Sequence, residues 1–480
     1  MKKTPLIRLR VVKAQRHDSA RPDAVANVHN SGHLTARERI ASLLDHETAV
    51  EFGSIAAIDT EGDWVPEYGG VDFIGQVNNQ PVIASSTDYT DRGGGYGGGR
   101  LEHLIALSQQ HRWPMVLFVD GGGSRARHPR NGLGHTELSG QFGRYTHFDG
   151  MAQLSGWVPT IAIVAGPSFA GHASIAGFSD FVIATKGSAI GMGGPPMVEA
   201  ALGLSLTPNE LAGAEMHDEL GGIDLLVNSD AEAINAAKIY LSFFEDRATG
   251  QLPDIGITDE FLFTTYKEDH ISLIIRSLID PGSYFELRPN FATTVTTGFA
   301  RINGKTVGVL ANNFFVRNGE IDESGATKAA RFVELCDSYE FPILSLIDSA
   351  GTVTSWKDEA TGVMVTEPGL SRSHTRALMA HQHRTVPLIS IQIGKAGGFS
   401  GHIMCGSPTG HISPLASFAW PNAEIGNVDG FSATRNMNAF DDVIEPGETR
   451  KNIANLLNLL PSQSDRRSLI SDKKHSVDTW

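Results

Sequence analysis

Two turns built from glycine and other small residues mark where this chain could do chemistry. Each follows an apolar strand that leaves a Val-Pro corner, and their sequences are GPSFAGHAS (Gly166–Ser174, the first turn) and GKAGGFSGH (Gly394–His402, the second turn). Small side chains let a bound carbonyl compound reach the main chain, and N–H groups at a helix start can stabilise an oxyanion such as an enolate. Taken alone, the same pattern is also typical of a tight turn or a nucleotide-binding loop.

Other catalytic patterns are missing from the sequence or incomplete. It has no Walker P-loop and no GxSxG nucleophile motif, and the GGGYGGGR run from Gly93 to Arg100 lacks the spacing and the acidic partner of a dinucleotide site. His381 and His383 form an HQH pair on an expected helix. Residues two positions apart on a helix point to different faces, so we expect no metal site.

The same series of segments occurs twice along the chain. WPMVLFVDGGGS matches FPILSLIDSAGT, which aligns Asp120 with Asp348, 228 positions later. VPTIAIVAGPSFAGHAS matches VPLISIQIGKAGGFSGH, and Gly166 and Gly394 keep the same interval. Strand–glycine turns recur in many α/β proteins, but one interval shared by several segments favours an internal duplication. The two turns are therefore expected at equivalent places in two homologous domains.

The repeated segments predict an α/β fold. FIGQVNNQPVIASS from Phe73 and FARINGKTVGVLAN from Phe299 alternate apolar and polar residues around Asn-containing turns, as β-hairpins do. Helical patterns, RLEHLIALSQQH and ATKAARFVELCDSYE, precede the short apolar strands. We predict tandem domains of repeated ββα units: an extension over 1–28, a first domain over 29–252 and a second over 253–480, divided near QLPDIGITDE.

Charge and composition narrow the class of protein. A formal net charge of −15 argues against nucleic-acid binding. Cys336 and Cys405 stand far apart, which excludes a disulfide framework and a four-cysteine zinc site, and both are expected in the cores. No stretch is apolar enough for a membrane helix, and the basic N-terminus lacks the apolar segment of a signal peptide. A cytoplasmic enzyme with no membrane partner is expected.

Several blocks of the sequence resemble a known family. HNSGHLTARERIASLLD from His29 to Asp45 resembles the H-x-x-G-K-L-T-A-R-E-R-I block of propionyl-CoA carboxylase β-subunits, with His33 in place of the lysine. GMGGPPMVEAALGLSLTPNELAGAEMH, KAARFVELCD and AWPNAEIG are similar to later blocks, in the same order. The chain thus resembles a divergent carboxyltransferase subunit of the acyl-CoA carboxylases over roughly residues 29 to 460.

The resemblance implies a fold, an activity and partners. It implies two crotonase-like domains in a homo-oligomer, a hexamer in the family. A biotin carboxylase and a biotin carrier on other chains would supply carboxybiotin, and the substrate would be a CoA thioester. The implied reaction moves a carboxyl group from carboxybiotin to the α-carbon of the acyl-CoA through an enolate. Alternatives are a 2-carboxyacyl-CoA decarboxylase or transcarboxylase, and a non-catalytic paralogue that acts in assembly.

The resemblance also assigns roles to residues of the two turns. The glycine pair that holds the enolate falls on Ala170 and Gly171, and the donors to the biotin ureido oxygen fall on Phe399 and Ser400. His402 occupies the position of the aspartate that selects the acyl group. Because Phe399 replaces a glycine, its ring either narrows the biotin entrance or points into the core with only its N–H at the site.

Further substrate contacts are expected around the turns. The small residues expected to contact substrate are Gly122, Gly123 and Gly398. Arg125 is a candidate for CoA phosphates, together with Arg100, Arg127 and Arg130, because a protein of negative net charge needs local positive charge to bind phosphate. A solvated basic loop explains the same arginines equally well.

Overall fold

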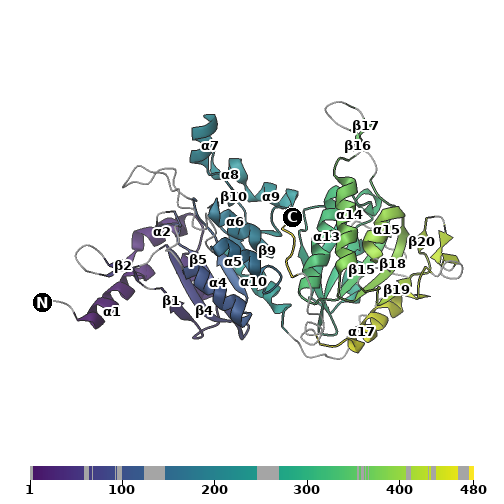
Figure 1. Ribbon diagram of the computed structural model, residues 1–480, viewed down its shortest axis with the longest axis horizontal. Helices are drawn as coiled ribbons and strands as arrows, with labels where there is room; N and C mark the ends of the chain where they lie inside the picture. Colours follow the sequence, from purple (N-terminus) through teal and green to yellow (C-terminus); the bar gives the residue numbers. More distant parts are fainter. Residues whose placement is uncertain are drawn as a thin grey trace. The chain divides into compact units, whose positions relative to one another are not determined.

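The computed structural model describes residues 4–53, 55–58, 64–66, 69–91, 93–94, 100–123, 146–245, 270–353, 356–357, 362, 364–365, 367–406, 412–426, 428–430, 432–433, 439–462 and 475–479. The chain divides into two compact units, Met1–Ser242 and Phe243–Asp478 with single terminal residues apart (Figure 1, purple to teal and green to yellow). The predicted boundary between 252 and 253 lies in 246–269, outside the described residues.

The first unit is built on a seven-stranded sheet of order β1-β4-β5-β6-β7-β9-β11. Strands β1, β4 and β5 pair antiparallel, and β5 onward pair in parallel. The strands are β1 (Val50–Phe52), β4 (Gly70–Val77), β5 (Gln80–Thr87), β6 (Met115–Phe118), β7 (Thr160–Val164), β9 (Phe181–Thr185) and β11 (Leu225–Val227). Two small sheets accompany it, β2 (Ile55–Ile58) with β3 (Trp64–Pro66), and β8 (Pro167–Phe169) with β10 (Ala189–Gly191).

Helices α4 to α6 pack on the main sheet of the first unit, and α3 and α10 also contact its strands. The helices are α1 (Pro5–Gln15), α2 (Pro22–Asn30), α3 (Ala36–Leu43), α4 (Arg100–His111), α5 (His147–Leu154), α6 (Gly171–Phe178), α7 (Pro195–Leu202), α8 (Pro208–Ala212), α9 (Ala214–Leu220) and α10 (Asp230–Ser242). One core cluster joins Leu104, Leu117, Met151 and Ile175, from α4, β6, α5 and α6.

The second unit repeats this plan, with strand order β12-β13-β14-β15-β18-β19-β22. The strands are β12 (Phe285–Leu287), β13 (Val295–Ile302), β14 (Lys305–Asn312), β15 (Ile343–Ser349), β18 (Leu388–Ala396), β19 (Ala416–Ala419), β22 (Asp442–Val443), and the short β16 (Trp356–Lys357), β17 (Met364–Val365), β20 (Glu424–Ile425) and β21 (Val428–Asp429). The helices are α12 (His270–Leu278), α13 (Glu323–Ser338), α14 (Leu370–His383), α15 (Gly398–Cys405) and α17 (Thr449–Leu459).

Both predicted hairpins are confirmed. β4 and β5 pair around Asn78 and Asn79, and β13 and β14 pair around Asn303 and Gly304; all four turn residues have positive φ, between 52° and 76°. Asparagine and glycine adopt this left-handed conformation most readily, which is why they mark two-residue hairpin turns. The predicted α/β fold with two homologous domains is also confirmed, because the strand orders and pairing directions of the two units correspond.

Buried and exposed residues settle smaller points. Cys336 is fully buried, as predicted, whereas Cys405 is partly exposed. His381 is buried and His383 exposed, so the two rings do point apart. Across the described ranges, no group of three or more His, Cys, Asp or Glu side chains is placed to hold a metal ion. Nor, within those ranges, is any helix long and apolar enough to cross a membrane.

Candidate active site

Asp120 fixes the start of the first turn. It lies two residues after the end of β6 and is buried, at 3% exposure. Oδ1 accepts hydrogen bonds from the N–H groups of Ala165 and Gly166, both at 2.9 Å, where β7 ends and the turn begins. A carboxylate that accepts two main-chain N–H bonds holds a glycine turn in one conformation.

The first turn ends at the N-terminus of α6. Ala170 has φ 54° and ψ −117°, a backbone conformation that residues other than glycine rarely adopt. Its N–H donates to the Gly191 carbonyl at 3.0 Å. The next amide, that of Gly171, has no hydrogen-bond partner among the described residues. Of the two predicted donors, only Gly171 therefore presents an unengaged N–H, at the positive end of the helix dipole.

Two further predicted residues lie beside this turn. Gly122 donates its N–H to the Gly93 carbonyl at 2.9 Å. Gly123 has φ 75°, and a Cβ there would lie 3.0 Å from the Ala170 Cβ. The structure thus brings Gly123 against Ala170, where a side chain would be strained by the positive φ and tightly packed.

The basic candidates are placed differently. Arg125, Arg127 and Arg130 lie in 124–145, outside the described residues. Arg100 lies in the first turn of α4, where its Nη1 donates to the Gly53 carbonyl at 2.6 Å and its Nε lies 3.3 Å from the Asp72 carboxylate. Its guanidinium is engaged within the chain.

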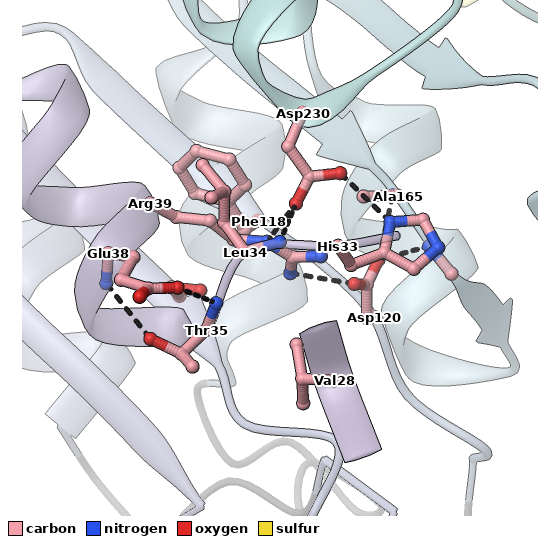
Figure 2. A network of polar contacts seen from close by, with 12 residues as sticks. Val28, His33, Leu34, Thr35, Glu38, Arg39, Phe118, Asp120, Ala165 and Asp230 are labelled. Atoms are coloured by element: carbon pink, nitrogen blue, oxygen red, sulfur yellow. Dashed lines mark hydrogen bonds and ion pairs between the residues drawn. The ribbon is translucent and has the colours of Figure 1, made fainter. Parts of the chain in front are cut away.

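A buried ion-pair network lies behind Asp120 and was not predicted from the sequence (Figure 2). Arg39 Nη1 binds Asp120 Oδ2 at 2.7 Å, and Arg39 Nε binds Asp230 Oδ2 at 2.8 Å. Asp230 also pairs with His33 Nδ1 at 2.9 Å, and it accepts the N–H of Leu34 at 3.0 Å. Two sequence signals pointed toward this site: the 228-residue interval between Asp120 and Asp348, and the block from His29 to Asp45, which contains His33 and Arg39.

The network shifts the acidity of its members. The hydrogen bond to Asp230 raises the pKa of His33 above 6.5, although burial opposes the rise. Burial alone would raise the pKa of Asp230, but the hydrogen bond with His33 and the charge of Arg39 hold it below its usual value. The Asp230 carboxylate is therefore stabilised in its charged form.

Asp348 holds the second turn in a similar way, but through one amide and without an arginine. Its Oδ1 accepts the N–H of Lys395 at 2.9 Å. No Lys or Arg side chain of the described residues forms an ion pair with this carboxylate. Burial is the main influence and raises the pKa of Asp348 from 3.8 to about 6, partly opposed by the Lys395 hydrogen bond and charge.

The second turn leads into α15 with two unengaged amides. The N–H of Gly397 donates to the Ser349 carbonyl at 3.2 Å, and the Ser349 and Ser400 hydroxyls lie 2.6 Å apart. The amide N–H groups of Phe399 and Ser400 have no partner among the described residues. Both amides of the predicted second donor pair therefore lie in the first turn of a helix without a hydrogen-bond partner among the described residues.

The Phe399 side chain does not lie in the core. It is 57% exposed, and its ring centroid lies 6.4 Å from that of His374 and 6.2 Å from that of His402. The interpretation that only its N–H faces the site is therefore wrong, and the ring stands at the helix start. His402 Nδ1 lies 3.4 Å from the Gly398 carbonyl, a contact within the helix.

The two turns share a residue of positive φ at the same position. Ala170 and Gly398 are 228 positions apart, the interval that relates Asp120 to Asp348, and their φ angles are 54° and 50°. In each unit a buried aspartate at a strand end thus holds a turn that passes through a left-handed residue into a helix start.

Comparison with known proteins identifies the family of the chain. Residues 27–435 match the family described as the carboxyl transferase domain. The chain belongs to this family. The expected enzyme class, an acyl-CoA carboxyltransferase, is confirmed.

Relatives of the carboxyltransferase cover nearly its whole length. It is 31% identical to the methylmalonyl-CoA carboxyltransferase 12S subunit of Propionibacterium freudenreichii subsp. shermanii, over 94% of this chain and 92% of that protein. It is 26% identical to the α-subunit of methylmalonyl-CoA decarboxylase from Veillonella parvula, over 94% of both. A crystal structure of transcarboxylase 12S with methylmalonyl-CoA and methylmalonic acid bound superposes with a TM-score of 0.81 at 29% identity, covering 96% of each chain.

Proposed function

We propose that this carboxyltransferase moves a carboxyl group between carboxybiotin and the α-carbon of an acyl-CoA, with an enolate as intermediate. The observation that carries the proposal is the pair of equivalent turns, each of which ends in unengaged N–H groups at a helix start: Gly171 in the first unit, and Phe399 and Ser400 in the second. Such groups stabilise negative charge on oxygen without rearrangement during the reaction.

The first turn is proposed to bind the thioester oxygen. Loss of a carboxyl group or a proton from the α-carbon leaves negative charge on this oxygen. The Gly171 N–H, at the start of α6, would donate to it and the helix dipole would add to the stabilisation. Ala170 would act through its shape, because its own N–H is already bonded to Gly191.

The second turn is proposed to bind the ureido oxygen of biotin. Loss of the carboxyl group as CO2 would leave negative charge on the ureido nitrogen and oxygen, and the amides of Phe399 and Ser400 would donate to this oxygen. When bound, biotin would carry the carboxyl group and accept the α-proton. The Phe399 ring would then form a wall of the entrance, with His374 and His402 beside it.

Partners are proposed from the relatives. The 12S structure is described as a hexamer assembly that binds substrate. By analogy we propose that this chain forms a homo-oligomer and receives carboxybiotin from a biotin carrier that a biotin carboxylase has loaded. The acyl group is proposed to be small, as in the methylmalonyl-CoA of the 12S structure.

Decarboxylation is a second candidate function. Relatives include α-subunits of methylmalonyl-CoA decarboxylase, and the exposed Phe399 ring restricts the second turn more than a glycine would. The first turn would serve both reactions, since each forms the same enolate.

Turnover of 2-carboxyacyl-CoA thioesters tests the proposal. Purified protein is given malonyl-CoA, methylmalonyl-CoA or a longer homologue, with and without free biotin, and loss of the carboxyl group is followed. Biotin-dependent loss supports carboxyl transfer. Loss at the same rate without biotin supports the decarboxylase, and absence of any turnover with all thioesters and biotin contradicts both.

A further inference from the structure

A single buried arginine joins three separate segments of the first unit (Figure 2). Arg39 lies on α3 and is 5% exposed; its two carboxylate partners, Asp120 after β6 and Asp230 at the start of α10, are 3% and 2% exposed. Its guanidinium also lies over the Phe118 ring, 5.5 Å from the centroid. Removing one member of such a buried set leaves an uncompensated charge.

The geometry of the contacts requires arginine. Nη1 points to Asp120 and Nε to Asp230, so one planar group bridges two carboxylates with different nitrogens. A lysine carries a single nitrogen and could not keep both contacts in the same directions. Asp230 is itself bonded to His33 and to the Leu34 N–H, so the carboxylate that binds Arg39 Nε is fixed independently of the first turn.

Asp120 links the arginine to the first turn. Its Oδ2 binds Arg39, while its Oδ1 binds the amides of Ala165 and Gly166. Gly166 lies five residues before Gly171, and the residues between them form β8 and the left-handed Ala170. A rotation of the Asp120 carboxylate would therefore move the start of the segment that carries the proposed donor.

We propose that Arg39 is a positioning residue for the acyl-side turn: it orients the Asp120 carboxylate, which in turn fixes the path of the chain toward the Gly171 amide. The inference rests on the proposed function, because it assumes that this amide binds the thioester oxygen. Arg39 itself touches no reacting atom.

The second unit provides an internal comparison. Asp348 binds one amide of the second turn, that of Lys395, one residue beyond the equivalent of Gly166, and among the described residues no arginine pairs with it. The arginine is thus not needed to form the turn, and it adds a fixed orientation on the acyl side.

Kinetics of Arg39→Met and Arg39→Lys test the inference, with Arg16→Met as the matched control. Arg16 is 3% exposed in the same unit and is paired with Glu51, so its loss disturbs folding in a similar way but not the first turn. Oligomeric state and thermal unfolding are recorded for all three variants. The rate assay follows biotin-dependent decarboxylation of methylmalonyl-CoA over a range of thioester concentrations.

We expect kcat of Arg39→Met at saturating methylmalonyl-CoA to fall about tenfold to a hundredfold, the range for a misplaced catalytic donor. Arg39→Lys should retain an intermediate rate, because it keeps one of the two charge contacts. KM should change much less than kcat, since a donor stabilises the charged enolate oxygen more than the thioester oxygen of the bound substrate. A wild-type kcat in folded Arg39→Met, or the same fall in Arg16→Met, would overturn the inference.

A binding measurement separates this inference from the proposed function. Affinities of the wild type for propionyl-CoA and for S-propyl-CoA, a thioether that lacks the carbonyl oxygen, are compared by calorimetry. The inference is supported if the ratio of the propionyl-CoA affinity to the S-propyl-CoA affinity is at least threefold smaller in Arg39→Met and Arg39→Lys than in the wild type. An undiminished preference in both variants overturns it alone, whereas no preference in the wild type contradicts the acyl-side donor itself and the inference with it.

Discussion

The two equivalent aspartates should respond to the same substitution in opposite ways. Asp348→Asn keeps the shape of the side chain and an oxygen that can accept the Lys395 N–H, but it removes the buried charge. The wild-type carboxyl group releases its proton at about pH 6 in the folded protein and at 3.8 in the unfolded chain. Between these values the unfolded state binds fewer protons, so wild-type stability falls as the pH rises.

The magnitude follows from the pKa. A rise from 3.8 to about 6 corresponds to about 3 kcal/mol of stability lost above pH 6. The asparagine amide accepts the Lys395 hydrogen bond more weakly than the carboxylate does, which reduces the stability gained by the variant by about 1 kcal/mol. At pH 8 we therefore expect Asp348→Asn to be about 2 kcal/mol more stable than the wild type, and at pH 4 no more stable.

Asp120→Asn provides the contrast. The substitution removes the partner of a buried arginine and leaves that charge opposed by Asp230 alone. We expect it to destabilise the first unit by about 3 kcal/mol or more at pH 8.

Urea denaturation at pH 4, 6 and 8 measures these differences. Hydrogen exchange of peptides from β6 and β15 assigns each transition to the first or the second unit. The reasoning is refuted if Asp348→Asn destabilises the second unit at pH 8, or if its effect is the same at pH 4 and pH 8.

Three further outcomes follow from the site. Ala170→Gly should stabilise the first unit by about 1 kcal/mol in thermal unfolding, because glycine removes the strain of φ 54°, and its decarboxylation rate should be at least that of the wild type. A loss of stability would show that the packing of the alanine methyl group outweighs the strain. Phe399→Gly should change the unfolding free energy by less than about 1 kcal/mol, because the ring is exposed, and should lower KM for free biotin several-fold; an unchanged KM would place the ring away from the entrance. The pKa of His33 is raised in the folded protein, so its pair with Asp230 adds stability at acidic pH that is lost as the pH rises through the folded-state pKa. His33→Gln should abolish this part of the pH dependence of the unfolding free energy in urea titrations. An identical pH dependence in the variant would exclude His33 as its source.

Much of the fold could be predicted because its determinants are local. The hairpin turns at Asn78–Asn79 and Asn303–Gly304 require left-handed residues, and alternating or continuous apolar runs mark the strands beside them. The 228-residue interval then related the two halves without any knowledge of their contacts.

The details of the site depend on contacts between distant segments. Arg39, Asp120 and Asp230 lie far apart in the sequence, and nothing in their local patterns shows that one arginine bridges both carboxylates. The bond between Ala170 and Gly191 and the exposure of Phe399 likewise follow from tertiary packing. The predicted assignment of donor roles to individual amides remains a prediction.

Transfer of label to biotin tests the central claim most directly. Methylmalonyl-CoA labelled in its free carboxyl group is incubated with the enzyme and excess free biotin, and carboxybiotin is trapped by methylation. We predict labelled carboxybiotin in amounts that approach those of propionyl-CoA formed, and its loss when avidin is added first. Label that appears only as CO2, at a rate that neither biotin nor avidin changes, would contradict carboxyl transfer.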